Sequence, residues 1–221
     1  MAQGPVAAFF DLDHTVLTRG SASLWARFEY REGRLSRGQF LRLAWWNLQY
    51  RLAVIDMAVI TRRLAASMRG QSEAELIARS NRWFEEMVRP CIAEGAVKRI
   101  REHMAEGHTV ALLTASTPYV SAPVCHALGL DERYICTRLE VQGGLFTGRC
   151  IEPICFGPGK VYWARAFAAE HRLDLAQSYF YTDSYTDLAM LLAVAHPVAV
   201  NPDARLRHHA TRTGWPVERF Y

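Results

Sequence analysis

The chain has 221 residues, half of them hydrophobic, and a formal net charge of +4 from 26 basic and 22 acidic side chains. This length allows one large domain with a full hydrophobic core, or a domain with an insert. The weak positive charge without a dense basic cluster does not predict nucleic-acid binding. Five cysteines, an odd number without a C-x-x-C pair, favour reduced thiols and therefore a cytoplasmic location.

Neither a signal peptide nor a transmembrane helix is expected. Residues 1–6 carry no basic segment, and the apolar run that follows them is short. The longest candidate span, residues 41–60, is interrupted by Arg42, Asn47, Arg51 and Asp56, which are unfavourable in a bilayer.

The first strand is predicted by an uninterrupted apolar run at residues 7–10, followed by Asp11 and Asp13. Such a run is typical of a parallel strand buried on both faces, and ligands of open α/β sheets bind at the carboxyl ends of strands. Two carboxylates about 4 Å apart repel by roughly 4 kcal/mol at an intermediate dielectric, so they need a cation or a shared proton. The alternative is that Asp13 caps the following helix and Asp11 only ends the strand.

Helical periodicity follows at residues 22–32, 37–50, 54–68 and 72–88, the last with a Ser72/Glu75 capping box. No further strand is predicted until residue 109, although a parallel strand needs neighbours. Residues 18–89 are therefore predicted to form an inserted helical cap, and residues 1–17 with 90–221 the core.

Beyond the cap the pattern alternates between helices and strands. Helices are predicted at 92–106, 117–128, 157–169 and 204–211, and strands at 109–113, 134–137, 179–182 and 197–200. Residues 138–151, with Gly143-Gly144 at the centre, predict a β-hairpin. The predicted fold is an α/β doubly wound, mainly parallel sheet with an inserted α-helical cap and a small hairpin flap.

Further polar residues fall at strand ends or helix starts, namely Thr114, Lys160, Asp183 and Asp187. Each has an ordinary explanation as a helix cap, a solvated lysine or a polar helix face. Because carboxyl ends of parallel strands share one sheet edge, we expect all four beside the two aspartates of the first strand. Three or four carboxylates in one crevice require a hard cation, and Mg²⁺ prefers oxygen ligands.

These residues together resemble the motifs of the haloacid dehalogenase superfamily, in particular its phosphoserine phosphatase-like branch. Asp11-Leu12-Asp13-His14-Thr15 matches the D-x-D-x-T motif, Thr114 the second motif, Lys160 the third, and Asp183-Ser184-x-x-Asp187 the fourth. The motifs occur in the family's order across essentially the whole chain.

The resemblance implies an Mg²⁺-dependent phosphatase. Asp11 would be the nucleophile that forms an aspartyl-phosphate, and Asp13 the general acid and base. The remaining implied roles are phosphate binding by Thr114, Ala115 and Lys160, metal binding by Asp11, Asp13 and Asp183, and support of these groups by Thr15, Ser184 and Asp187.

The substrate is less defined than the reaction. Phosphoserine-specific members carry an acidic residue after the first motif, but residues 17–21 contain none. Ala115-Ser116 replaces paired glycines, and Thr182 stands where the family favours glycine. A small phosphate ester remains the expected partner, with amino-acid-like, histidinol and lysolipid phosphates as candidates.

The cap is rich in aromatic and basic side chains, and its aromatic residues predict either a cap core or an apolar pocket. An excess of arginine between residues 18 and 60 indicates a solvated face or, alternatively, contact with an anionic substrate or a membrane surface. The aromatic residues are Trp25, Phe28, Tyr30, Phe40, Trp45, Trp46, Tyr50, Trp83 and Phe84, and the arginines are Arg19, Arg27, Arg31, Arg34, Arg37, Arg42 and Arg51.

Two other functions use the same chemistry. A phosphotransferase or mutase would pass the aspartyl-phosphate to another hydroxyl. A phospho-receiver module would hold it without turnover, but such modules are about half this length and lack an acid at the position of Asp13. The sequence does not predict the oligomeric state.

Overall fold

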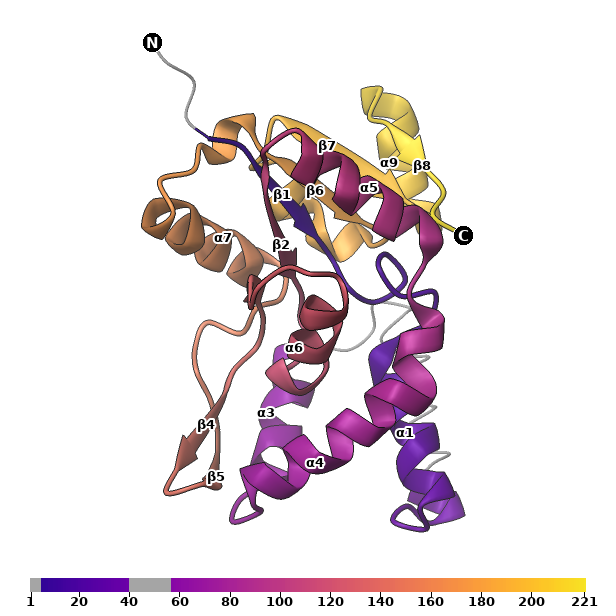
Figure 1. The fold of residues 1–221 in the computed structure, drawn as a ribbon, viewed down its shortest axis with the longest axis vertical. Coiled ribbons are helices and arrows are strands. Elements are labelled where there is room, and N and C mark those ends of the chain that lie inside the picture. Colours follow the sequence, from indigo (N-terminus) through magenta and orange to yellow (C-terminus); the bar gives the residue numbers. More distant parts are fainter. Residues whose placement is uncertain (1–4, 40–56) are drawn as a thin grey trace.

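The computed structural model describes residues 5–39 and 57–221. Its centre is a six-stranded parallel sheet with the strand order β3-β2-β1-β6-β7-β8, which confirms the predicted fold class (Figure 1). The strands are β1 (Ala7–Phe10), β2 (Thr109–Leu113), β3 (Tyr134–Ile135), β6 (Tyr179–Thr182), β7 (His196–Val200) and β8 (Val217–Glu218). Phe10 pairs with Leu112 on one side and Tyr181 on the other, so β1 lies inside the sheet.

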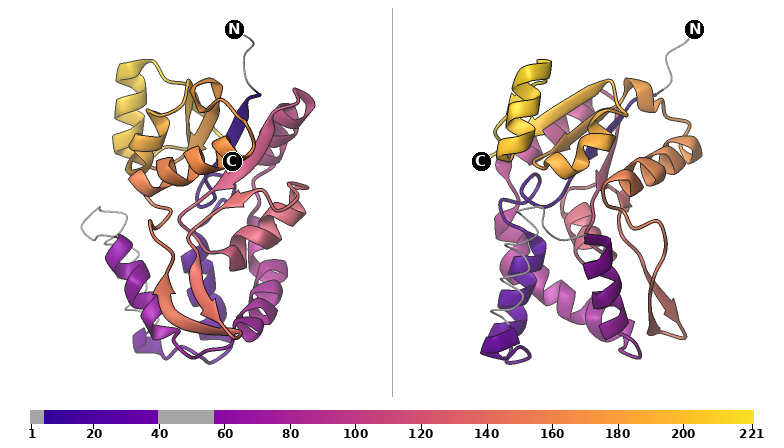
Figure 2. Two further views of the ribbon diagram at one scale, coloured as in Figure 1. Left: turned by 90° about the vertical axis from the view of Figure 1, so that its left-hand side faces the viewer. Right: turned by 180° about the vertical axis from the view of Figure 1, so that it is seen from behind.

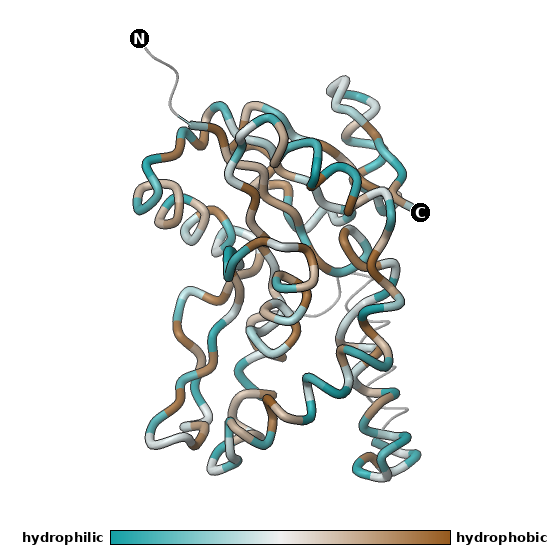
Figure 3. The backbone as a smooth tube through the Cα atoms, in the orientation of Figure 1, coloured by the Kyte–Doolittle hydropathy of each residue, from teal (hydrophilic) through white to brown (hydrophobic). Residues whose placement is uncertain are grey.

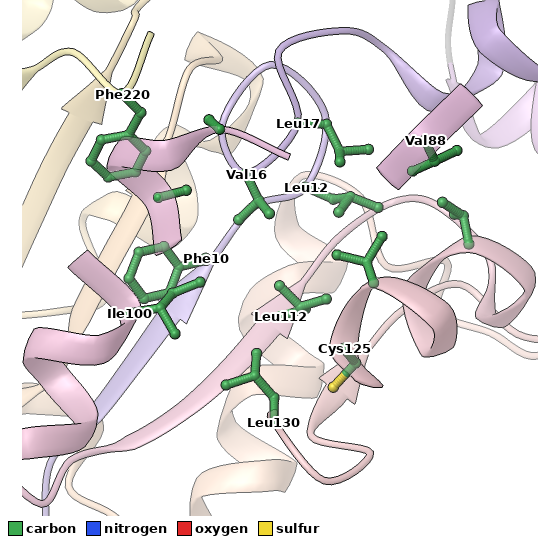
Figure 4. Close-up of a cluster of buried hydrophobic side chains, with 14 of the residues drawn as sticks. Phe10, Leu12, Val16, Leu17, Val88, Ile100, Leu112, Cys125, Leu130 and Phe220 are labelled. Atoms are coloured by element: carbon green, nitrogen blue, oxygen red, sulfur yellow. The ribbon is translucent and has the colours of Figure 1, made fainter. Parts of the chain in front are cut away.

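Helices cover both faces of this sheet (Figures 1 and 2). Helices α5 (Glu94–Ala105) and α6 (Pro118–Ala127) pack on one face. Helices α7 (Pro158–Glu170), α8 (Leu188–Leu191) and α9 (Ala204–Thr213) pack on the other. Alternate side chains of β1 point to opposite faces, so Phe9 and Phe10 enter different cores, and Figure 4 shows Phe10 near Ile100 and Leu112.

The helices of the predicted cap lie beyond the carboxyl ends of the strands (Figure 1). They are α1 (Ser21–Arg31), α3 (Met57–Ser67) and α4 (Glu73–Trp83), and a π-helical turn (Phe84–Val88) and a 3₁₀ turn (Arg89–Cys91) follow α4. Most of the predicted helix at 37–50 lies outside the described residues. Figure 3 shows apolar residues concentrated along the central strands and polar residues on the outer turns of the helices.

The chain enters and leaves this helical region at one place. The Thr18 amide donates to the Cys91 carbonyl at 2.8 Å, and the Ala93 amide donates to the Val16 carbonyl at 2.9 Å. The two connecting segments therefore run side by side, next to the loop that carries Asp11 and Asp13.

The predicted hairpin forms a separate two-stranded antiparallel sheet, β4 (Leu139–Gln142) and β5 (Leu145–Cys150). It packs along α3 rather than extending the main sheet. The Gly70 amide donates to the Phe146 carbonyl at 2.8 Å, and the Phe146 amide donates to the Gln71 carbonyl at 3.0 Å. The hairpin is thus joined to the helical region by backbone hydrogen bonds.

Several short elements differ from the sequence prediction. The strand predicted at 134–137 is shorter, because only Tyr134–Ile135 pairs with β2. Strand β8 and the 3₁₀ turns at Leu175–Gln177 and Tyr185–Asp187 were not predicted.

No helix in the described part of the chain has the length and hydropathy of a membrane span.

Candidate active site

The centre of the site is a buried lysine between two carboxylates. Asp11 follows β1 directly, and its amide donates to the Tyr181 carbonyl of β6 at 2.9 Å. Lys160 Nζ donates to Asp11 Oδ1 at 2.6 Å and to Asp187 Oδ2 at 2.7 Å. The lysine side chain is only 2% exposed. One cation therefore holds two acids that are distant in the sequence, and these hydrogen bonds carry charge on both partners.

Close backbone packing brings Lys160 into this position at the start of α7. Gly157 has a φ of +51°, a left-handed conformation that favours glycine. Gly159 approaches the preceding loop so closely that a Cβ atom would lie 1.9 Å from the Ile154 carbonyl oxygen. The two glycines let the first turn of α7 lie against the sheet edge, so that Lys160 reaches Asp11.

Thr182 supports the lysine from the end of β6. Its hydroxyl is buried and donates to Asp187 Oδ2 at 2.7 Å, the same oxygen that Lys160 contacts. The Ser184 amide donates back to the Thr182 hydroxyl at 3.3 Å. The threonine therefore orients Asp187 and steadies the turn after β6. Sequence reasoning noted Thr182 only as a departure from glycine and missed this contact.

Asp13 faces the first turn of α1. The Ser21 amide donates to Asp13 Oδ1 at 2.6 Å, and the Ser21 hydroxyl donates to Asp13 Oδ2 at 3.0 Å. Ser116 also donates to Asp13 Oδ2, at 3.4 Å, and its hydroxyl lies 3.0 Å from that of Ser21. Asp13 thus accepts hydrogen bonds from the start of α1, as expected if it caps that helix. It also contacts Ser116 in the loop after β2.

Asp11 and Asp13 both have raised pKa values. Burial, partly offset by Lys160 and reinforced by Asp187, raises the pKa of Asp11 to about 7. Burial raises the pKa of Asp13 as well, although hydrogen bonds from Ser21 oppose the shift. For Lys160, burial alone would lower the pKa, but Asp11 and Asp187 together raise it, so the lysine stays charged.

Asp183 is the unpaired acid of the group. Burial, followed by repulsion from Asp11, Asp187 and Asp13, raises its pKa well above the ordinary value. Within the described residues its carboxylate has no hydrogen bond or ion pair, while its backbone carbonyl accepts from the Asp203 amide at 2.8 Å. Four acids thus gather around a single buried lysine, and an unpaired carboxylate among them fits a hard divalent cation such as Mg²⁺.

The other residues of interest occupy supporting positions. Thr114 directly follows β2 with its hydroxyl buried, and this hydroxyl accepts from the Ser116 amide at 3.1 Å. Ala115 follows it in the loop before α6. The Thr15 hydroxyl is buried without a hydrogen-bond partner among the described residues. The Ser184 hydroxyl lies 2.9 Å from that of Thr186 and caps the 3₁₀ turn that carries Asp187.

The described cap aromatics are largely core residues. Phe28, Trp83 and Phe84 belong to the same buried cluster as Phe10, and Trp25 packs edge-on against Trp83 with ring centroids 5.1 Å apart. Phe40, Trp45, Trp46 and Tyr50 lie outside the described residues. Ion pairs join Arg31 to Glu86 and Arg34 to Glu29, so part of the arginine excess is neutralised locally.

Several known proteins are similar to this chain in sequence. A protein named inhibition of morphological differentiation protein from Streptomyces azureus is 35% identical over 222 residues, which cover 97% of this chain and 78% of that protein. A phosphoserine phosphatase from Mycobacterium tuberculosis is 35% identical over 97% of this chain and 70% of its own length. A histidinol-phosphatase from Neisseria meningitidis is 28% identical over 96% of this chain and 98% of its own length.

Solved structures share the fold. A protein of unknown function from Bordetella pertussis superposes with a TM-score of 0.88 and 33% identity, over 98% of this chain and all of that one. A phosphoserine phosphatase captured as a phospho-aspartyl intermediate analogue superposes with a TM-score of 0.73 at 16% identity, over 99% and 95%. The sequence model of haloacid dehalogenase-like hydrolases matches residues 8–192. The chain therefore belongs to the haloacid dehalogenase-like hydrolase family.

Proposed function

We propose that this protein is an Mg²⁺-dependent phosphatase that hydrolyses a phosphate monoester through an aspartyl-phosphate on Asp11. The observation that carries the proposal is the buried contact of Lys160 with Asp11 and Asp187, at the strand edge where Asp13 and Asp183 also lie. Two relatives that match nearly the whole chain are named phosphatases, which supports the same reaction class.

Asp11 is the proposed nucleophile. Its Oδ1 is held by Lys160 at 2.6 Å, and the strand end fixes its backbone. The lysine charge lowers the repulsion between the carboxylate and an incoming phosphate dianion, and its ammonium can bind a phosphoryl oxygen during transfer. Thr114 and Ala115, at the end of the neighbouring strand β2, are placed to bind further phosphoryl oxygens.

Asp13 is the proposed acid and base. Its raised pKa lets it hold a proton closer to neutral pH than an exposed aspartate does, and hydrogen bonds from Ser21 and Ser116 fix its orientation. It would protonate the leaving alkoxide as Asp11 attacks phosphorus. It would then remove a proton from the water that hydrolyses the aspartyl-phosphate.

The Mg²⁺ ion would be held by the carboxylates of Asp11 and Asp183 and by the backbone carbonyl of Asp13. When bound, the ion supplies positive charge that offsets the negative charge of the phosphoryl group and the clustered acids. Asp187 would orient Lys160, while Thr15 and Ser184 support the two loops.

The division into core (1–17 and 90–221) and cap (18–89) is part of the proposal. The paired connections at Val16–Ala93 and Thr18–Cys91 support it, because an insert should enter and leave at neighbouring points. The cap faces the carboxyl edge and would select the substrate. The first turn of α1 has no acidic residue, which argues against an amino-acid ammonium group there and makes phosphoserine a weak candidate.

The test is release of inorganic phosphate from p-nitrophenyl phosphate with and without Mg²⁺. We expect Mg²⁺-dependent release that Asp11→Asn abolishes, with the circular dichroism spectrum unchanged because the two side chains have the same shape. Asp131→Asn is the matched control, since this aspartate is exposed and lies on the loop before β3. Phosphate release by Asp11→Asn at the wild-type rate would contradict the nucleophile assignment.

The same assay separates hydrolysis from phosphotransfer. Adding an acceptor alcohol should leave phosphate as the main product if the protein is a phosphatase, whereas a phosphotransferase would phosphorylate the alcohol instead. A panel of phosphoserine, histidinol phosphate and lysophosphatidate would then define the substrate class. The five free cysteines support a reducing, cytoplasmic location, which fractionation with antibody detection can test.

A further inference from the structure

A second group of metal-ligating side chains lies at the opposite edge of the sheet from Asp11. His103 is in the last turn of α5, Glu106 follows that helix, and His108 directly precedes β2. Because Thr114 follows β2 at the carboxyl edge, residues at the start of β2 lie at the amino edge, which is the upper edge of the sheet in Figure 1. The proposed catalytic steps do not use this group.

Three ligand atoms of this group converge. His103 Nδ1 lies 2.8 Å from His108 Nδ1, and Glu106 Oε2 lies 3.4 Å from the His108 nitrogen and 4.0 Å from the His103 nitrogen. A tetrahedral zinc ion with bonds of about 2.0–2.1 Å holds its ligand atoms roughly 3.3 Å apart. The observed separations bracket this value, so small side-chain rotations would place all three atoms around one ion.

The surroundings are compatible with the tautomer that binds a metal. His103 Nε2 lies 2.8 Å from the Tyr181 hydroxyl, which can accept a hydrogen bond from Nε2–H, and in that tautomer the Nδ1 lone pair faces His108. Ligating histidines commonly donate their second ring N–H to such an oxygen, which fixes the ring. The His103 side chain is 5% exposed and the His108 side chain 18%, whereas Glu106 is 61% exposed and forms the open side.

We propose that His103, Glu106 and His108 bind a zinc-type transition-metal ion at the amino edge of the sheet, with water in the fourth position. Two imidazoles and a carboxylate are a zinc donor set, whereas Mg²⁺ prefers oxygen ligands. The ion would replace the hydrogen bond between the two Nδ1 atoms. His103 would keep its proton on Nε2, and the His108 ring would change from the Nδ1–H to the Nε2–H tautomer. The ion would join the end of α5 to the start of β2.

Zinc titration of the metal-free full-length protein by calorimetry tests this assignment. Excess Mg²⁺ is kept in the buffer so that the oxygen ligands near Asp11 are occupied. We expect one equivalent of Zn²⁺ to bind to the wild type, and at least tenfold weaker binding to His108→Gln and Glu106→Gln. His126→Gln is the matched control, because this histidine is exposed on α6, and it should bind like the wild type.

Co²⁺ substitution identifies the ligand type. Nitrogen and oxygen ligands should give weak visible bands alone, whereas an intense near-ultraviolet sulfur-to-cobalt band would place the ion on cysteines and overturn the proposal. Undiminished one-equivalent Zn²⁺ binding in both glutamine variants, or no binding to the wild type, would also overturn it. Because none of these measurements uses phosphate release, they stand apart from the test of the phosphatase proposal.

Discussion

At the scale of single residues, charge balance determines the properties of the site. Lys160 is one buried cation, and it faces Asp11 and Asp187 at hydrogen-bond distance while Asp13 and Asp183 stand nearby. Removing either partner of a buried ion pair leaves an uncompensated charge, which is far less favourable than an exposed one. The excess of negative charge therefore makes the site unfavourable until protons or a cation neutralise it.

Thr182→Val should reveal how strongly this charge cluster depends on one hydroxyl. Valine keeps the volume but removes the donor to Asp187 Oδ2 and the acceptor for the Ser184 amide. Hydrogen bonds to charged groups contribute about 1.5–3 kcal/mol, so we expect the free energy of unfolding to fall by that amount in urea denaturation. We also expect slower phosphate release, because Asp187 would orient Lys160 less well.

Thr182→Ser is the matched control for this prediction. Serine retains the hydroxyl and should keep most of the stability and rate, since it loses only a methyl group. Equal stability of the valine variant and the wild type would show that the bond from Thr182 to Asp187 contributes nothing.

The motif spacing located the acids and the lysine but not the groups that orient them. Asp11, Asp13, Lys160 and Asp187 were identifiable because charged residues at strand ends and helix starts follow a regular order in the chain. Ser21, Ser116 and Thr182 were not identified as partners, since small hydroxyl residues occur throughout the sequence and only folding brings them to the acids. The close spacing of Thr114 and Ser116, with Ala115 between them, offered the single local signal, because the Ser116 amide closes a turn onto the Thr114 hydroxyl.

At the scale of elements, α7 shows how a helix start positions a reactive side chain. Its hydrophobic residues Ala164 and Ala168 pack on the sheet, but the first turn depends on contact between the Gly159 backbone and the Ile154 carbonyl. The hydrophobic periodicity of the helix does not predict this contact, because glycine has no side chain.

Gly159→Ala should therefore be destabilising. The added Cβ would lie 1.9 Å from the Ile154 carbonyl oxygen, which is backbone and cannot move away alone. Overpacking of this kind costs about 1–3 kcal/mol, and we expect a lower midpoint in thermal unfolding together with loss of phosphate release as Lys160 shifts. Gly38→Ala is the control, since no atom of the described residues lies within 4 Å of its added Cβ. A Gly159→Ala protein with wild-type activity would contradict the close packing.

The regular elements followed from the sequence where periodicity and capping agreed. Ser72 caps α4 through the Glu75 amide, as its capping box predicted, and Gly143-Gly144 lie at positive φ in the hairpin turn. The π-helical turn Phe84–Val88 and the two-residue strand β8 carry no such pattern. They form because tertiary packing buries Phe84 and Val88 and because the chain after α9 returns along β7.

At the scale of the whole molecule, the two edges of the sheet differ in donor chemistry. The carboxyl edge carries aspartates, a lysine and hydroxyl groups, whereas the amino edge carries His103, Glu106 and His108 near Tyr181. A separate apolar cluster covers each face of the sheet, one beneath α5 and α6 and the other beneath α7, α8 and α9. The molecule thus combines a two-sided apolar core with unfavourable polar groups at its carboxyl edge, and the helical region lies beyond that edge (Figure 2).

A substitution of Asp183 should show that repulsion among the acids at this edge lowers the stability of the metal-free protein. Without divalent metal, Asp183→Asn removes a carboxylate that is repelled by Asp11, Asp187 and Asp13 and has no described partner, so the variant should be more stable than the wild type. Stabilising substitutions commonly contribute about 0.5–2 kcal/mol, and we expect a gain in that range by urea denaturation in EDTA.

With Mg²⁺ at 100 times its Kd the wild type should gain about 2.7 kcal/mol, while the variant gains much less. The order of stability would therefore reverse between EDTA and Mg²⁺, and Asp131→Asn, an exposed control, should show no reversal. If Asp183→Asn were less stable than the wild type in EDTA, repulsion among the acids would not be what limits this edge, and an equal response of both proteins to Mg²⁺ would remove Asp183 from the metal site.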